Sequence, residues 1–207
     1  MNTSHSPQGG STIYNAQIVA GSLMMPESRK IARLLLKNTD DKAWHQAIVV
    51  DNILQKKNPA TSKRQAKLIR NRLELMTEEL WKLIVEGSAD TVVQSLLAAA
   101  IKHSRLVGDF MDRIVRDRWH TFKRNLCDKD WQEHMEMCAQ IDPVVTQWTA
   151  TTQNKLKQVA LRMLAEAKYV DGTKAMQILP VSVLPEVKSY LIRNNEQYVL
   201  RCMEVTQ

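Results

Sequence analysis

The longest amphipathic stretch of the sequence runs from Ala89 to about Phe122, and it favours a fold built of helices. Ser88 is a good N-cap before this stretch, and we expect a bend near Gly108. Only six glycines and six prolines interrupt the 207 residues, which is typical of an all-α protein. We therefore predict a multi-helix bundle whose core spine consists of Leu96, Leu97, Ala100, Ile101, Phe110, Met111, Ile114 and Val115.

Caps and prolines divide the rest of the chain into further helices, at about 26–37, 42–54, 60–76, 77–87, 128–141 and 153–168, with one or two more over 186–203. The helix over 42–54 should bury Trp44, Ala47, Ile48 and Val50. The first three helices predict an N-terminal three-helix unit resembling a helix-turn-helix. Gly172 and the extended residues 176–183 are typical of a C-terminal winged-helix-like segment, and equally of a plain linker.

The expected domain organisation follows from these segments. We expect a disordered tail over residues 1–12, an N-terminal helical unit over 13–87 and a C-terminal helical unit over 88–207, and the two units can also form one continuous domain.

Composition indicates a cytoplasmic protein with no membrane partner. The three cysteines are far apart in sequence, which favours reduced thiols over a disulfide framework. The polar first dozen residues do not resemble a signal peptide. The longest nearly apolar run, Val92 to Ile101, has half of the roughly 20 residues that a transmembrane helix needs.

Positive charge is concentrated between Asn52 and Leu73, which contain seven cations and no carboxylate. The whole chain has 29 Lys and Arg against 22 Asp and Glu, so without these seven the two counts are equal. The formal excess of +7 can thus be assigned to about one tenth of the chain. A concentrated excess of this kind favours a polyanionic partner such as nucleic acid.

The same stretch has the signals of a helix with two different faces. Asn58 and Pro59 are typical of a helix start. A row of Lys and Arg on a helix is most often a solvated face. Such faces usually contain Glu between the cations, whereas here the first acidic residue after Asp51 is Glu74. At 100° per residue, one face would pack through Ala66, Ile69, Leu73 and Met76. We predict that nucleic acid contacts Lys56, Lys57, Lys63, Arg64, Lys67, Arg70, Asn71 and Arg72.

Most of these cations should contact phosphates, whereas Arg64, Arg70 and Asn71 have planar donors that can read base edges. We therefore expect weak sequence specificity. A secondary set of candidate contacts lies on later helices. It consists of Lys102, Arg105, Arg113 and Arg116, which neighbouring aspartates partly neutralise, together with Lys155 and Lys157. Trp119 could stack on a base, although a helical Trp beside Phe122 more often packs in the core.

Catalytic signatures are missing from the sequence. Cys127, His134 and Cys138 could be three zinc ligands, but they lack the paired arms of such sites, so a chance arrangement is the better interpretation. No glycine-rich phosphate loop or nucleophile motif occurs. We expect no catalytic residue, no metal and no cofactor.

Several short segments of the sequence together resemble the BrxA family. They are Met-Pro-Glu-Ser at 25–28, Leu-Gln-Lys-Lys-Asn-Pro-Ala-Thr at 54–61, Ile-Arg-Asn-Arg-Leu at 69–73, Leu-Ala-Ala-Ala-Ile-Lys-His-Ser-Arg at 97–105, Gly-Asp-Phe-Met at 108–111 and Tyr-Val-Leu-Arg-Cys-Met at 198–203. BrxA is a small component of the BREX bacteriophage-defence systems. The resemblance implies an all-helical protein, comparable with the RNA-binding antitermination factor NusB, that binds nucleic acid, with double-stranded DNA as the suggested ligand.

Together, the residues and the resemblance predict a non-catalytic accessory protein of the BREX system that binds double-stranded DNA and works with other BREX proteins. Two alternatives stay open. One is a protein-interaction scaffold that docks an acidic partner on the basic helix, and the other is an RNA-binding protein resembling NusB.

Overall fold

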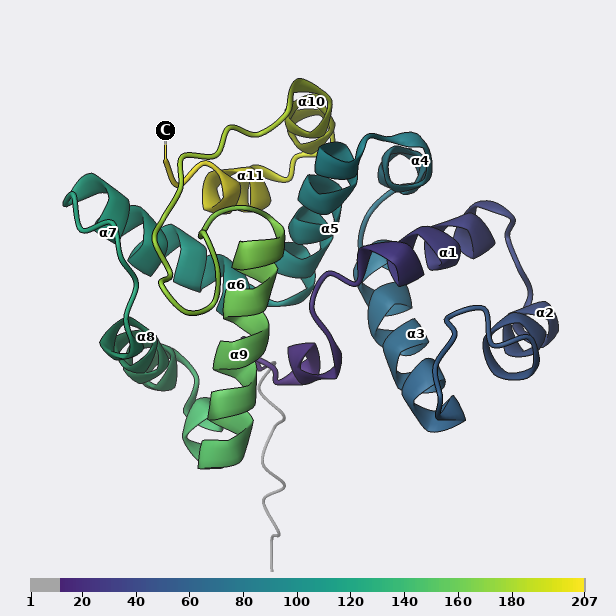
Figure 1. Cartoon of the computed structure of the whole chain (residues 1–207), viewed down its shortest axis with the longest axis horizontal. Helices are drawn as coiled ribbons and strands as arrows, with labels where there is room; N and C mark the ends of the chain where they lie inside the picture. Colours follow the sequence, from purple (N-terminus) through teal and green to yellow (C-terminus); the bar gives the residue numbers. More distant parts are fainter. Residues whose placement is uncertain (1–11, 207) are drawn as a thin grey trace, which may run out of the picture.

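The computed structural model describes residues 12–206, and over this range the chain forms helices and no β-strand (Figure 1). The predicted all-α multi-helix fold is therefore confirmed. The elements in chain order are η1 (Gln17–Ala20), α1 (Met25–Leu36), α2 (Asp41–His45), the π-helix η2 (Gln46–Val50), α3 (Pro59–Glu74), α4 (Glu78–Glu86), α5 (Ala89–His103), α6 (Arg105–Asp109), the π-helix η3 (Phe110–Val115), α7 (Arg116–His120), α8 (Asp128–Ile141), η4 (Pro143–Gln147), α9 (Ala150–Glu166), α10 (Pro185–Arg193) and α11 (Gln197–Met203).

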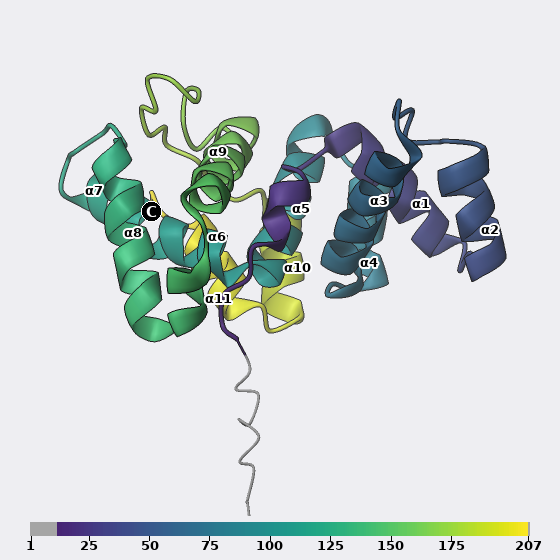
Figure 2. The same cartoon turned by 90° about the horizontal axis from the view of Figure 1, so that it is seen from below.

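Helix α5 is the centre of the molecule. It packs against three earlier helices, α1, α3 and α4, and against three later helices, α6, α10 and α11. Figure 2 shows α1 to α4 at one end, α7 to α9 at the other, and α5 between them. The predicted N-cap is present, since the Ser88 hydroxyl accepts a 3.2 Å hydrogen bond from the Thr91 amide. All eight residues of the predicted spine are buried, so that prediction is confirmed.

The predicted bend near Gly108 is at a different residue. The helix breaks at Ser104, whose φ of −128° and ψ of 96° are extended, and a new helix begins at Arg105. Gly108 lies inside α6, where an added Cβ would be 2.5 Å from the hydroxyl oxygen of Tyr198. The glycine thus permits the close approach of α11, and it does not bend the chain.

The N-terminal helices follow the predicted order, but their connections differ from the prediction. The second helix ends at Val50 and not at Leu54, and its last turn is a π-helix. This change of period rotates Val50 outward, where it is 61 % exposed, so its predicted burial was wrong. Residues 51–58 then lead to α3, and this connection is longer than the roughly three or four residues of a helix-turn-helix turn. The helix-turn-helix geometry stays a prediction.

The segment between α9 and α10 contains no strand, and over the described chain it makes only isolated bridges, Val170 with Ile178 and Gln177 with Asn125. A wing is therefore not confirmed, and the segment runs as a linker. Beyond it the two closing helices are α10 and α11, which are separated by Asn195 with a φ of 57°.

One hydrophobic cluster extends from Tyr14 to Val205 and includes residues on both sides of residue 87. Both predicted units, 13–87 and 88–207, contribute to this core. The division of the chain at residue 87 stays a prediction. The predicted disordered tail lies, apart from residue 12, outside the described residues. Over residues 12–206, no helix is both long and apolar enough to cross a bilayer.

Candidate nucleic-acid interface

Helix α3 begins where the sequence predicted. The side chain of Asn58 accepts a 2.8 Å hydrogen bond from the Ala60 amide, and Pro59 is the first helical residue. The inner face of α3 is packed, since Ala66, Ile69 and Leu73 are each at most 1 % exposed. Local capping and burial therefore fix which side of α3 faces solvent.

The outward side of α3 carries Lys63, Arg64 and Lys67, and Lys57 lies just before the helix, in the connection over residues 51–58. We call these four cations the α3 basic face. All four are exposed, and none forms an ion pair with any residue that the structure describes. No carboxylate of residues 12–206 lies within 4 Å of these cations, so their charge is uncompensated within that part of the chain. Figure 1 shows α3 beside α2 at one end of the molecule, away from α7 to α9.

Lys56 and Arg70, two of the predicted contact residues, are paired with acidic side chains. The ammonium of Lys56 lies 2.5 Å from the Glu27 carboxylate. Burial alone would raise the pKa of Glu27, but the hydrogen bond from Lys56, a backbone hydrogen bond and the charges of Lys56 and Lys30 together hold that pKa below its usual value. The guanidinium of Arg70 lies 2.6 Å from Glu74 and covers the ring of Trp44, 4.6 Å from the ring centroid.

Arg72 was predicted to contact nucleic acid, and this prediction was wrong. The residue is 4 % exposed, and its guanidinium donates hydrogen bonds to the carbonyls of Ser22, at 2.5 Å, and Gly21, at 3.0 Å. Burial lowers its pKa to about 10, although the charge of Glu166 opposes the shift. Arg72 comes nine positions after Lys63, and at 100° per residue this places it on the side of the helix opposite Lys63. Asn71 lies between these two sides and is half-buried.

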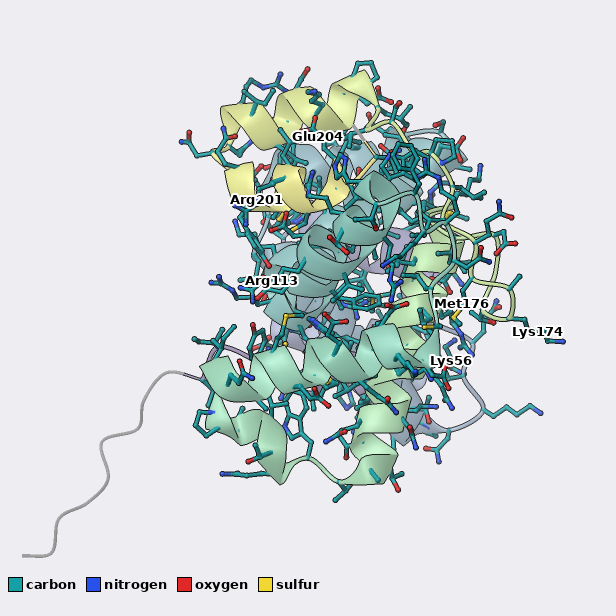
Figure 3. The ribbon with its side chains drawn as sticks, turned by 90° about the vertical axis from the view of Figure 1, so that its left-hand side faces the viewer. Lys56, Arg113, Lys174, Met176, Arg201 and Glu204 are labelled. Carbon is teal, nitrogen blue, oxygen red and sulfur yellow. The ribbon has the colours of Figure 1, made fainter. Side chains whose placement is uncertain are left out.

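The secondary candidates do not form a free basic surface. Arg105 and Arg113 both lie near the buried carboxylate of Asp109, at 3.5 and 3.8 Å. Figure 3 shows Arg113 and Arg201 along one edge of the molecule. The other acidic partners are Glu196 for Lys102, Asp112 for Arg116 and Asp128 for Lys157. Lys155 alone of the six is exposed without an ion pair among the described residues.

Trp119 is half-buried against the core, and the Arg124 guanidinium covers its ring at 3.6 Å from the centroid. The arginine therefore occupies one face on which a base could have stacked.

The three possible zinc ligands do not converge. Cys127 is exposed, whereas His134 and Cys138 are buried side by side, with Cys138 Sγ 3.6 Å from His134 Nε2. No cluster of three or more His, Cys, Asp or Glu side chains suited to a metal occurs in residues 12–206. Burial lowers the pKa of His134 to about 4 and raises the pKa of Cys138 to about 11, as for a neutral pair inside a core.

The sequence interpretation missed the buried role of Asp109. The hydroxyls of Tyr14 and Tyr198 donate hydrogen bonds of 2.7 and 2.6 Å to its two carboxylate oxygens. Burial alone would raise the pKa of Asp109, but these two hydrogen bonds and the charges of Arg113 and Arg105 together keep that pKa low. An aspartate between Gly108 and Phe110, inside an apolar run, was the signal available in the sequence.

The fold and this surface define an all-α protein with one exposed, uncompensated cationic helix face. A family model described as BrxA matches residues 12–195. The BREX protein BrxA of Paramagnetospirillum magneticum (strain ATCC 700264 / AMB-1) is 46 % identical, over 93 % of this chain and 97 % of that protein. The BREX protein BrxA of Escherichia coli O9:H4 (strain HS) is 35 % identical, over 96 % of each chain. The chain belongs to the BrxA family.

A solved structure has the same fold. It is the crystal structure of an uncharacterized protein from Magnetospirillum magneticum, with a TM-score of 0.87 and 45 % sequence identity over 93 % of this chain and 99 % of that one.

Proposed function

We propose that this chain is a non-catalytic accessory protein of a BREX defence system, and that it binds double-stranded DNA through the α3 basic face in the cytoplasm. The observation that carries the proposal is that Lys57, Lys63, Arg64 and Lys67 are exposed and have no acidic partner among the described residues. Membership of a family whose relatives are named BREX proteins supports the defence role and other BREX proteins as partners.

The proposed contacts are mainly electrostatic. Cations at Lys63 and Lys67 are one helical turn apart, so both can contact the phosphate backbone at once. Each neutralised phosphate releases condensed counterions, so four contacts predict a log–log slope of affinity against salt of about −3.6 for B-DNA. Arg64 and Asn71 keep the geometry to read base edges, whereas Arg70 would first have to leave Glu74 and Trp44.

Measurement of duplex affinity at several salt concentrations tests the electrostatic proposal. We expect a linear log–log plot with a slope of about −3 to −4. A slope near zero, or no binding to free duplex at moderate salt, would contradict it and favour the interaction scaffold.

Competition between duplex DNA and structured RNA separates DNA binding from the NusB-like alternative. We expect unlabelled duplex to displace labelled duplex at lower concentration than a hairpin RNA of equal length. Displacement by RNA at the lower concentration would assign the α3 basic face to RNA.

A further inference from the structure

A groove lies beside the α3 basic face, between α3 and the α2–η2 segment. We call its apolar lining residues, Trp44, Ile48, Val49 and Ala66, the floor of the groove. The rest of the lining consists of Asp41, His45, Lys63, Lys67 and Arg70. The volume is about 370 Å³, near the lower end of the roughly 300 to 1,000 Å³ of typical ligand pockets. A site of this size suits one bulky side chain.

The groove depends on the irregular turn that precedes it. The floor residues Ile48 and Val49 belong to the π-helix η2, a rare element that is frequent at functional sites. The same element turns the neighbouring Val50 outward to 61 % exposure.

The charges around the groove select the kind of occupant. Lys63, Lys67 and Arg70 line it, against the single carboxylate of Asp41, which lies 3.9 Å from Arg70. Arg70 is further compensated by Glu74, so Lys63 and Lys67 supply the free positive charge. An occupant that complements this site is apolar at its centre and acidic at its flanks.

We propose that the groove docks a short segment of a partner protein that carries a bulky apolar side chain flanked by Asp or Glu. The lining favours an apolar protein side chain over a nucleobase, because Ile48, Val49 and Ala66 are aliphatic. Of the polar groups beside them, Asp41 and Arg70 are already paired with each other, which leaves His45 and the two lysines. This inference goes beyond DNA binding and does not depend on it. Because Lys63 and Lys67 serve both surfaces, an acidic segment and duplex DNA compete for the protein.

A selection from a displayed library of short random peptides, with the whole chain as bait, tests the proposal without a known partner. The enriched peptides are expected to share one large apolar residue with Asp or Glu on both sides. Val49→Asp places a carboxylate in the floor and weakens their binding at least about tenfold. Val50→Asp is the matched control, because it adds the same charge at the next, exposed position, and it changes affinity less than about twofold.

Enrichment of basic or uncharged peptides, no enrichment above background, or equal binding by the two variants overturns the proposal. Helicity measured by circular dichroism shows that Val49→Asp is folded, and a Trp44→Ala variant, which must also lose peptide binding, repeats the test without adding charge. A double variant, Lys57→Glu with Arg64→Glu, lies outside the groove lining and keeps peptide binding. Its loss of DNA binding tests the DNA proposal separately. If no peptide is selected and the NMR signal of the Trp44 indole shifts when duplex DNA is added, the groove belongs to the DNA-binding surface and the proposal fails.

Discussion

The hydroxyl of Tyr14 donates a 2.7 Å hydrogen bond to the carboxylate of Asp109, 95 positions further along the chain. The Tyr198 hydroxyl donates to the other oxygen of the same carboxylate. The residues before α1, the central helices and α11 are thus joined at one buried charge. This charge stays ionised because two neutral donors and the nearby Arg105 and Arg113 stabilise it.

Tyr14→Phe should therefore destabilise the fold. It removes one hydrogen bond to a buried charge, which contributes about 1.5 to 3 kcal/mol. Urea unfolding followed by circular dichroism measures the difference, and Tyr198→Phe should give a similar loss. A loss below about 0.5 kcal/mol for both variants, the level of a neutral surface change, would contradict the role assigned to Asp109.

The buried His134 should make stability depend on pH. Its folded-state pKa of about 4 is below the usual 6.5, so the unfolded chain binds the proton more tightly. Stability is thus fully present above pH 6.5 and is lost as pH falls toward 4, by about 2 to 3 kcal/mol. His103, whose pKa burial lowers to about 4, contributes in the same direction and over the same window.

Unfolding in urea at pH 7 and pH 4.5, for wild type and His134→Gln, measures this contribution. The variant lacks the titrating ring, so its loss on acidification should be smaller than that of wild type. An equal loss in both proteins would assign the pH dependence to other groups.

Arg72→Ala tests whether Arg72 stabilises the fold, in contrast to an exposed cation of the same helix. The change leaves the carbonyls of Ser22 and Gly21 without their buried donors, so we expect a loss of about 2 to 4 kcal/mol in the free energy of unfolding. Lys67→Ala, at an exposed position of the same helix, should change it by no more than about 0.5 kcal/mol. The reverse order of the two losses in urea unfolding would contradict the burial of Arg72.

Gly108→Ala tests the close packing of α6 against α11. Alanine is the better helix former, yet its Cβ would lie 2.5 Å from the Tyr198 hydroxyl oxygen that holds Asp109. We expect a net destabilisation of about 1 to 3 kcal/mol, as for an overpacked core. Gly172→Ala is the matched control, since a Cβ at that position would have no neighbouring atom within 4 Å, and it should leave the melting temperature unchanged.

The sequence predicted what local chemistry decides. Asn58 and Pro59 placed the start of α3 because a cap and a first-turn proline act within one turn. The buried face of α3 and the spine along α5 followed from helical period and apolar content. Arg72 was misassigned because it was grouped by charge, although its angle on the helix already placed it on the packed side.

Long-range pairing limited the rest of the prediction. Glu27 pairs with Lys56 across 29 positions of the sequence, and Glu196 pairs with Lys102 across 94 positions. The residues next to either lysine in the sequence do not indicate these ion pairs. The π-helix at 46–50 and the break at Ser104 also depend on tertiary packing, which overrides a continuous helical pattern. Consequently the cluster of charge was predictable, whereas the subset left free for a partner was not.

DNA binding through the α3 basic face is tested most directly by reversing its charge and measuring duplex binding. The triple variant Lys63→Glu, Arg64→Glu, Lys67→Glu is compared with Lys129→Glu, Arg162→Glu, Lys174→Glu, which makes the same charge change at exposed positions with no ion pair among residues 12–206. Both are first checked for helicity, and duplex affinity is then measured against salt. We predict that the α3 variant loses about a hundredfold in affinity at low salt and reduces the salt slope by about three, while the control keeps its slope. Equal losses in the two variants, or none in either, would contradict binding through this face.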